Sequence, residues 1–371
     1  MPSRFLHIVA FNVPYPADYG GVIDIYYKVK ALKEAGVRVI LHCFEYGRKP
    51  VKELDEVCFM VHYYPRKSGL LYQLKRIPYI VTTRTSNSMP NKLFNDPFPI
   101  LFEGIHTTGI LHLCGPAGKK SLVRTHNIEH EYYARLSESE PDLLRKWYLR
   151  AEARKLKRYE GRLSMADHLL AISRKDAKYF NNRFGDTVFI PPFHRFEEVT
   201  AIPGSGDYIL FHGNLGVPEN STMVSFLLRR VFPEIGHRVV IAGKDPPPRL
   251  IRMLEERSRT ELIANPDDEQ IKRMISGAQV NILITGQSSG LKLKLLHALY
   301  AGRHCLANTA MVDGTGLEEL CHIADEPADL VRLTNELMGK PFTEQEVGRR
   351  RKTLEDYSNR VGAEKILRLI G

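Results

Sequence analysis

The sequence predicts an α/β protein with two doubly wound, Rossmann-like domains that face a central cleft. Short β-type runs alternate with helical stretches from end to end, as in parallel α/β sheets. The length of 371 residues suits two domains, each large enough to bury a core. The stretch IPGSGD at 202–207 divides the alternating series into two, and we expect the linker at 201–206.

The first domain is expected over residues 1–200. FLHIVAFN (5–12) predicts a strand, GVIDIYYKVKALKEAG (21–36) an amphipathic helix and VRVILHCF (37–44) the next strand. Further strands are predicted at 121–126, 168–173 and 187–192. Residues 45–120 hold scattered Pro, Tyr and basic residues with little period, so they are assigned only as irregular elements.

The second domain is expected over residues 207–342. Its predicted strands are 208–213, 238–243, 261–265, 280–285 and 304–308. Residues 343–371 are helical by composition and are expected to pack back towards the first domain. Thr343 is the predicted N-cap of this helix, and Glu346 completes a capping box.

Composition indicates a cytoplasmic protein. No apolar run approaches the roughly 18 residues of a membrane span, and the N-terminal segment predicts a strand, not a signal peptide. The five cysteines form no CxxC pair, so we expect reduced thiols.

The excess positive charge lies in the first domain. Residues 1–200 hold 31 Lys and Arg against 21 Asp and Glu, and residues 201–371 hold 22 of each. This asymmetry favours a negatively charged partner: a phosphorylated substrate, an anionic membrane surface or nucleic acid. No nucleic-acid-binding module is recognisable, so nucleic acid is not expected. The segment 143–163 predicts a basic amphipathic helix that either lies on a membrane or packs its apolar side on the sheet.

The segment ITGQSSGLKLKLLHALYAGRHCLAN (284–308) predicts a phosphate site. A strand runs into a Gly/Ser turn, and a helix is expected to open at Gly290 with free N–H groups and a favourable dipole. On such a helix Gly290, Lys294 and His297 share one face, and Lys292 points the other way. An ordinary amphipathic helix with solvated lysines is an equally open interpretation.

Other candidate side chains follow the predicted strands, where parallel sheets bind ligands. Gly20 and Gly21 would let a ligand approach the backbone. His126 could act as hydrogen-bond partner or base, and Glu103 and His106 lie in an expected cleft-side loop. The spacing of His126, Glu129 and His130 disfavours a metal site. Turns at 212–220 and 243–250 lie at strand ends of the second domain, with Lys244 placed to reach a phosphate. For each of these loops a purely structural role remains an alternative.

These segments together resemble a family 4-like (group 1) retaining glycosyltransferase of the GT-B fold. The matching segments, in order, are PYPADYGGVIDIYYKVKALKEAGVRVILH, LVRTHNIEHEYYARLSES, LRKWYLRAEARKLKRYEGRL, LLAISRKD, HGNLGVPEN, VVIAGKDPPPRL and GLKLKLLHALYAG. They cover nearly the whole chain except about residues 45–95.

The resemblance implies metal-independent transfer of a sugar, of the hexosyltransferase type, from a nucleotide-sugar to an acceptor hydroxyl of a cell-surface glycan or glycolipid. It implies no cofactor, because the nucleotide-sugar is a co-substrate. The acceptor is expected to be a glycan or lipid-linked, with the enzyme peripheral at the inner face of the cell membrane.

The resemblance also implies roles for individual residues. His126 is expected to lie beside the transferred sugar as the catalytic residue. The expected donor-binding residues are Gly20, Gly21, Gly213, Asn214, Lys244, Ser289, Gly290, Leu291, Lys294 and His297. The expected acceptor-side residues are Asp18, Tyr19, Glu103, His106 and Asn127.

Two departures from the family pattern stand out. The Glu-x7-Glu signature would require glutamates at Ser289 and His297. The Arg and Lys that commonly neutralise the diphosphate correspond to Asn214 and about Glu219, so Lys294, Lys244 and the helix N-terminus would have to replace them. These losses favour a non-catalytic GT-B binding protein as the alternative. A nucleotide-sugar epimerase is a lesser alternative, because the order of the motifs argues against it.

Overall fold

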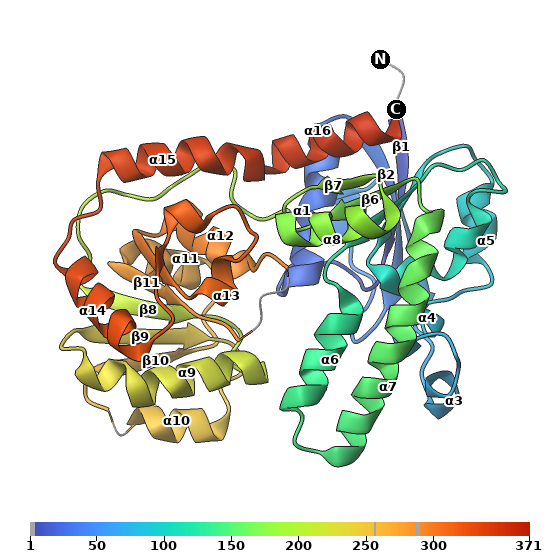
Figure 1. Ribbon diagram of the computed structural model, residues 1–371. Helices are drawn as coiled ribbons and strands as arrows, with labels where there is room; N and C mark the ends of the chain where they lie inside the picture. Colours follow the sequence, from blue (N-terminus) through green and yellow to red (C-terminus); the bar gives the residue numbers. More distant parts are fainter. Residues whose placement is uncertain (1–3, 256, 287–289) are drawn as a thin grey trace. The chain divides into compact units, whose positions relative to one another are not determined.

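The computed structural model describes residues 4–255, 257–286 and 290–371. The chain forms two compact units, one from Met1–Arg195 with Asn359–Gly371 and the other from Phe196–Ser358. Each unit has one parallel sheet with helices on both faces (Figure 1). The doubly wound α/β class predicted from the alternating pattern is confirmed.

The first unit contains a seven-stranded parallel sheet in the order β3-β2-β1-β4-β5-β6-β7. The strands are β1 (Arg4–Ala10), β2 (Val37–Glu45), β3 (Met60–Pro65), β4 (Ile100–Glu103), β5 (Ser121–Thr125), β6 (His168–Ala171) and β7 (Thr187–Phe189). Chain order reverses between β1 and β4, and such a reversal opens a crevice at the carboxyl ends of the two strands.

The second unit repeats this topology in a six-stranded parallel sheet, β10-β9-β8-β11-β12-β13. Its strands are β8 (Tyr208–His212), β9 (Arg238–Gly243), β10 (Thr260–Ala264), β11 (Val280–Leu283), β12 (His304–Ala307) and β13 (His322–Ile323). Here the order reverses between β8 and β11.

Helices cover the faces of both sheets. Those of the first unit are α1 (Gly20–Glu34), α2 (Glu53–Val57), α3 (Leu70–Gln73), α4 (Tyr79–Thr82), α5 (Met89–Phe94), η1 (Ile105–Leu113), α6 (Glu129–Ser139), α7 (Leu143–Tyr159), η2 (Glu160–Met165), α8 (Arg174–Phe184) and α16 (Asn359–Ile370). Those of the second unit are α9 (Pro218–Arg230), η3 (Phe232–Glu234), α10 (Pro248–Glu255), α11 (Asp268–Gly277), α12 (Leu293–Ala301), α13 (Thr309–Val312), η4 (Glu318–Leu320), α14 (Pro327–Met338), α15 (Glu344–Leu354) and η5 (Glu355–Tyr357). Within the described ranges, no helix is long and apolar enough to cross a membrane.

The ten strands predicted outside residues 45–120 are all present, within a few residues of the expected ends. The assignment of 45–120 as irregular is wrong, because this stretch contributes β3 and β4 to the sheet. All four residues of β4 are buried, and the strand pairs with both β1 and β5. A buried strand of four residues leaves neither an alternating nor a helical pattern in the sequence.

The helix after β11 begins later than predicted. Lys292 is its N-cap, and Gly290 lies before it in the left-handed region at φ 66°. Gly290, Lys294 and His297 therefore do not share one helical face. Ser289 lies outside the described residues.

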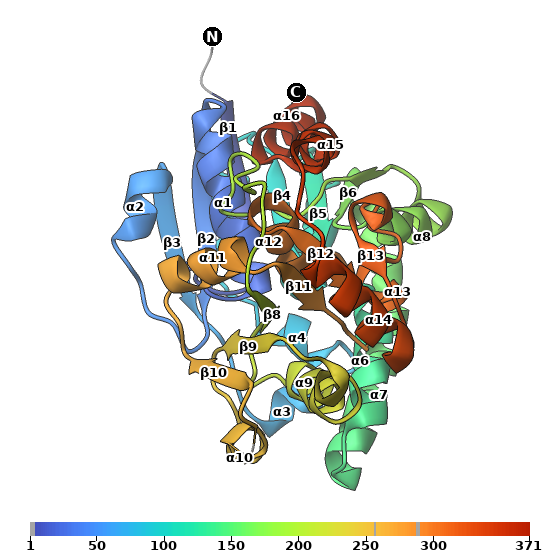
Figure 2. The same ribbon diagram turned by 90° about the vertical axis from the view of Figure 1, so that its left-hand side faces the viewer.

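The C-terminal segment forms two helices where one was predicted. The capping box at the start of α15 is confirmed, with Thr343 and Glu346 as its partners. Helix α16 belongs to the first unit and packs against α1 (Figure 2), with Ala363 and Ile366 in the same core as Ile25. The segment expected as a linker is tied to the second unit, since Gly204 pairs with Phe342 through two backbone hydrogen bonds.

Candidate functional site

The topological reversal in the first unit brings together the ends of β1, β4 and β5. Phe11 follows β1, Glu103 ends β4 and His126 follows β5. Helix α1, which begins at Gly20, contributes Asp24 and Lys28 from its second and third turns. Residues far apart in the sequence therefore meet at the sheet edge where α/β proteins bind ligands.

A buried ion-pair network holds this edge together. The Lys28 ammonium lies 2.9 Å from Asp24 Oδ2 and 2.6 Å from Glu103 Oε1. Arg124 donates two hydrogen bonds to Asp24, at 2.9 and 3.1 Å, and Phe193 N–H donates a third at 2.7 Å. All four charged side chains are fully buried or nearly so. Buried charges persist only when they are paired in this way.

The network keeps both carboxyls ionised. Burial by itself raises the pKa of Asp24, but Arg124 and Lys28 outweigh it and the pKa lies well below its ordinary value. Burial likewise opposes ionisation of Glu103, whose pKa is nevertheless lowered by Lys28 and by the hydrogen bond from His126. A fixed negative charge therefore stands behind the His126 ring.

His126 is oriented by Glu103. Its Nε2–H donates to Glu103 Oε2 at 3.1 Å, and the Phe11 ring lies edge-on at 5.5 Å between centroids. The His126 side chain keeps 12 % exposure, whereas Glu103 has none. Because Nε2 carries the proton, Nδ1 is the nitrogen that remains to accept a hydrogen bond.

The same three side chains do not fit a metal ion. Ligand atoms of Asp24, Glu103 and His126 lie within 4.8 Å of one another. The Lys28 ammonium, however, bridges the two carboxylates and fills the cation position between them. A divalent ion there would have to displace a fully buried, doubly paired ammonium.

The loop before α1 is held by residues of the same unit. Arg48 pairs with Asp18 and lies over the Tyr19 ring at 5.1 Å. Asn12 donates to the Tyr19 hydroxyl at 3.1 Å. A Cβ at Gly21 would approach the Phe11 ring to 2.6 Å, so glycine is needed here for packing, independently of any ligand. Gly20 is the first helical residue.

His106 and Asn127 lie near this edge but differ in their hydrogen bonding. His106 stacks at a tilt on Phe11, and burial lowers its pKa well below the ordinary value, which keeps the ring neutral. Its Nδ1 has no hydrogen-bond partner among the described residues. Asn127 hydrogen-bonds to Glu129, whose pKa is raised to about 7 by burial.

In the second unit, two turns meet at the carboxyl ends of β8 and β9. A Cβ at Gly243 would collide with the Gly213 carbonyl oxygen, so the close approach of the turns requires glycine. The Lys244 carbonyl accepts from Leu215 N at 2.8 Å and from Gly216 N at 3.1 Å. Lys244 is thus fixed by its backbone at the edge where the sequence predicts a phosphate-binding lysine.

Lys294 is joined to the same edge by hydrogen bonds. Its Nζ donates to Asn220 Oδ1 at 3.1 Å and to the Ile284 carbonyl at 3.4 Å, and Asn220 donates to the Asn214 carbonyl at 2.9 Å. Burial lowers the pKa of Lys294 to about 8, with Glu219 opposing the shift. Lys294 therefore lies close to the turn at Gly213 and Asn214, at the reversal of strand order between β8 and β11.

His297 and Leu291 are placed differently from Lys294. The His297 ring lies edge-on to Phe196 at 5.2 Å, one turn further along α12. Leu291 is buried. Lys294 is joined through Asn220 to the turn after β8.

Sequence reasoning missed Asp24, Lys28, Arg124 and Asn220. The i, i+4 spacing of Asp24 and Lys28 on the buried side of a helix was the available signal. Arg124 and Asn220 contact residues 100 and 74 positions away, and no local pattern reveals such pairs.

No family model matches the sequence. An uncharacterized 44.6 kDa protein in the cps region of Klebsiella pneumoniae is 25 % identical over 327 residues, covering 83 % of this chain and 84 % of that protein. Among solved structures, TarM has a TM-score of 0.68 at 11 % identity over 99 % of both chains. A glycosyltransferase from Rickettsia africae scores 0.66 at 13 % identity, over 100 % of this chain and 98 % of the other. Anabaena HepE in complex with UDP and glucose scores 0.66 at 10 % identity over 98 % of both. These similarities show that the chain has the GT-B fold.

The raised pKa of Glu129 gives a test of the site electrostatics. Between about pH 4.5 and 7 the folded chain retains a proton that the unfolded chain has lost, so the free energy of unfolding falls as pH rises through this window. Glu129→Gln does not titrate and should become more stable than the wild type by up to about 3 kcal/mol above pH 7. Urea unfolding followed by Trp147, the only tryptophan, reports on the same unit.

Glu138→Gln, an exposed change on the same helix, is the control and should show a small stability difference at every pH. A constant difference between Glu129→Gln and the wild type from pH 5 to 8 would contradict the buried, neutral Glu129.

Proposed function

We propose that this chain is a glycosyltransferase that moves a sugar, of the hexosyl type, from a nucleotide-sugar to an acceptor hydroxyl with retention of configuration. The observation that carries the proposal is His126, held by Glu103 at the topological reversal of a GT-B chain. A partly exposed imidazole with one nitrogen fixed by a buried carboxylate suits hydrogen bonding to a sugar hydroxyl. The ammonium that bridges the carboxylates occupies the cation position between them, which supports a reaction at this edge without a metal ion.

The second unit is proposed to bind the donor. Lys294 provides a positive charge at the carboxyl ends of β8 and β11, and a diphosphate beside it would favour the protonated form of a group whose pKa lies near 8. Backbone groups of the turn at Gly213 and Asn214 lie beside it. That HepE was solved with UDP and glucose supports a nucleotide-sugar as the ligand class.

The first unit is proposed to bind a glycan or lipid-linked acceptor, with Asp18, Tyr19, Glu103, His106 and Asn127 on the acceptor side. Ionised Glu103 acts by holding His126, and the Arg48 contacts fix the loop that carries Asp18 and Tyr19. The similar protein in the Klebsiella pneumoniae cps region supports a role in polysaccharide biosynthesis.

A non-catalytic glycan- or nucleotide-binding protein is the second candidate. The absence of both signature glutamates favours it, since His297 stands at the second position and lies against Phe196. Incubation of the chain with UDP-, GDP- and ADP-sugars and acceptor extracts decides between them. Release of a nucleoside diphosphate with product formation supports the enzyme, and binding without turnover supports the second candidate.

The first unit also has an apolar and basic surface suited to an anionic membrane at the cytoplasmic face. The side chains that are 64 to 82 % exposed are Leu70 and Leu71 of α3, Leu74 at its C-cap, and Leu143, Leu144 and Trp147 of α7. Lys155 donates to the Gln73 carbonyl at 2.6 Å and holds α3 against α7. The other side of α7 is packed, with Ala153, Leu156 and Tyr159 buried. Exposed leucines beside basic residues favour binding at a lipid interface.

Lys294→Ala should weaken nucleoside diphosphate binding by about 1–3 kcal/mol, the scale of a charge-assisted hydrogen bond. Isothermal titration calorimetry measures the loss. Lys272→Ala, an exposed change on α11, should leave the affinity unchanged. Equal affinities for wild type and Lys294→Ala would remove Lys294 from the donor site.

His126→Ala should lower kcat about 10²-fold or more with little change in nucleotide affinity, because its contact matters mainly in the transition state. Steady-state kinetics together with nucleotide titration separates the two effects. His112→Ala, an exposed histidine of the same unit, should retain full turnover. A folded His126→Ala variant with wild-type kcat would contradict the assignment.

Vesicles containing anionic lipid should bind the chain at low salt and release it at high salt. Replacing Arg150, Arg154, Lys157 and Arg158 with Gln should abolish co-sedimentation. Replacing Arg229, Arg230, Arg252 and Lys272 of the second unit is the matched control and should leave binding intact. Binding that survives the first set of changes would contradict a basic membrane surface on α7.

A further inference from the structure

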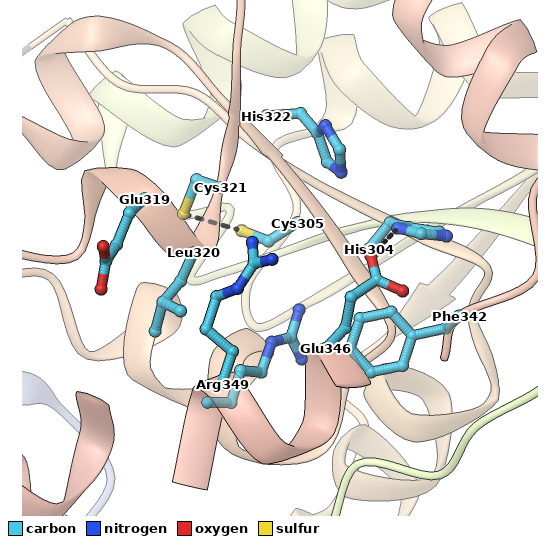
Figure 3. Close-up of a pocket in the computed structure, with 10 residues that line it drawn as sticks. His304, Cys305, Glu319, Leu320, Cys321, His322, Phe342, Glu346 and Arg349 are labelled. Carbon is cyan, nitrogen blue, oxygen red and sulfur yellow. Dashed lines mark hydrogen bonds and ion pairs between the residues drawn. The ribbon is translucent and has the colours of Figure 1, made fainter. Parts of the chain in front are cut away.

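A second cluster of ligating side chains lies in the second unit, at the edge of its sheet. His304 begins β12, His322 begins β13 and Glu346 lies in the first turn of α15. One ligand atom of each lies within 4.8 Å of the others. The three residues line a small pocket of about 70 Å³, shown in Figure 3. None of them belongs to the site proposed for sugar transfer.

His304 presents an unpartnered nitrogen to this pocket. Its side chain is fully buried, and Nε2–H donates to the Lys340 carbonyl at 2.9 Å. That bond fixes the tautomer and leaves Nδ1 unprotonated, and Nδ1 has no hydrogen-bond partner in the described part of the chain. A histidine with one nitrogen anchored to a carbonyl and the other free is the usual arrangement of a metal-binding histidine.

Glu346 is oriented in a similar way. Its Oε2 accepts from the backbone N–H and the hydroxyl of Thr343, both at 2.8 Å, as part of the capping box. Its other oxygen, Oε1, lies 3.7 Å from His304 Nδ1. Two atoms each about 2.1 Å from a tetrahedral zinc ion are about 3.4 Å apart, so this pair needs only a small adjustment.

His322 completes the set from the neighbouring strand. Its ring lies 5.6 Å from the His304 ring at 63° between planes. The neutral imidazole is the form of histidine that binds a metal ion. Figure 3 shows the two rings and the Glu346 carboxylate around the pocket.

We propose that His304, His322 and Glu346 bind a divalent late first-row transition metal ion, with Zn²⁺ as the expected occupant. Two imidazoles and a carboxylate are the ligands that such ions prefer, and a pocket of this volume has room for a water in the fourth position. Bound metal would connect β12, β13 and the first turn of α15, and so stabilise the second unit.

Nearby groups set the expected strength of binding. Arg350 lines the pocket but donates to main-chain carbonyls of Leu299, Gly302 and Arg303, with its guanidinium over the Phe342 ring at 4.5 Å. Its positive charge and the presence of only three protein ligands make the site weaker than a closed four-ligand zinc site. Cys305 and Cys321 contact each other at 3.8 Å between sulfurs and are not needed as ligands.

Calorimetric titration of the chelator-treated full chain with ZnCl₂ tests the proposal. One ion per chain should bind and raise the thermal midpoint. Glu346→Gln, which preserves the capping hydrogen bonds, and His322→Phe, which preserves a ring, should each weaken binding about 10- to 100-fold. His237→Ala and Cys321→Ser are the controls and should bind as the wild type does.

Three results would overturn the proposal. They are no binding by the wild-type chain, wild-type affinity in both Glu346→Gln and His322→Phe, and loss of binding in Cys321→Ser. Circular dichroism of each metal-free variant establishes that it is folded before titration. The readout is metal affinity, so it is independent of glycosyl transfer.

Discussion

The Lys28 ammonium between Asp24 and Glu103 is the interaction on which the site in the first unit depends. It joins α1 to β4, and through Asp24 the network extends to Arg124 on β5. Removing one buried partner of such a network leaves an uncompensated charge, which costs about 3–5 kcal/mol. The network thus fixes three elements and also supplies the ionised carboxylate that orients His126.

Both units place their polar groups at a reversal of strand order. In the first unit this edge carries His126, Glu103 and the loop before α1. In the second it carries Lys294, Asn220 and two turns brought together at Gly213 and Gly243. The repeated topology gives each unit one reversal of strand order, the kind of sheet edge at which α/β proteins bind ligands.

Long apolar strands and capped helices were predictable from the sequence, because their signals are local. The capping box at Thr343 and Glu346 is an example. Strands β3 and β4 were not, since β4 has four residues and gains its stability from neighbours on both sides. The start of α12 was predicted too early, at Gly290. The backbone of Gly290 is in the left-handed region, so this residue cannot belong to the helix.

Some residues of the candidate sites could likewise be predicted from the sequence, and others could not. His126 follows a predicted strand and Lys294 lies on a predicted helix, so their approximate positions could be inferred. Glu103 was placed only in a cleft-side loop, because the strand that it ends was not predicted. Their partners Lys28, Arg124 and Asn220 could not be inferred, because those contacts join distant segments. The cluster of His304, His322 and Glu346 could not be predicted from the sequence either. It depends on the pairing of β12 with β13 and on the position of the first turn of α15.

The central claim is that a GT-B chain without the signature glutamates binds a sugar-nucleotide. The most direct test is the thermal midpoint of the full chain, measured with UDP, GDP, ADP or CMP. A ligand that binds only the folded chain raises the midpoint with concentration. The structure predicts such a rise for one nucleoside diphosphate, and a much smaller rise in Lys294→Ala. An unchanged midpoint with all four nucleotides at millimolar concentration would contradict donor binding at the β8–β11 edge.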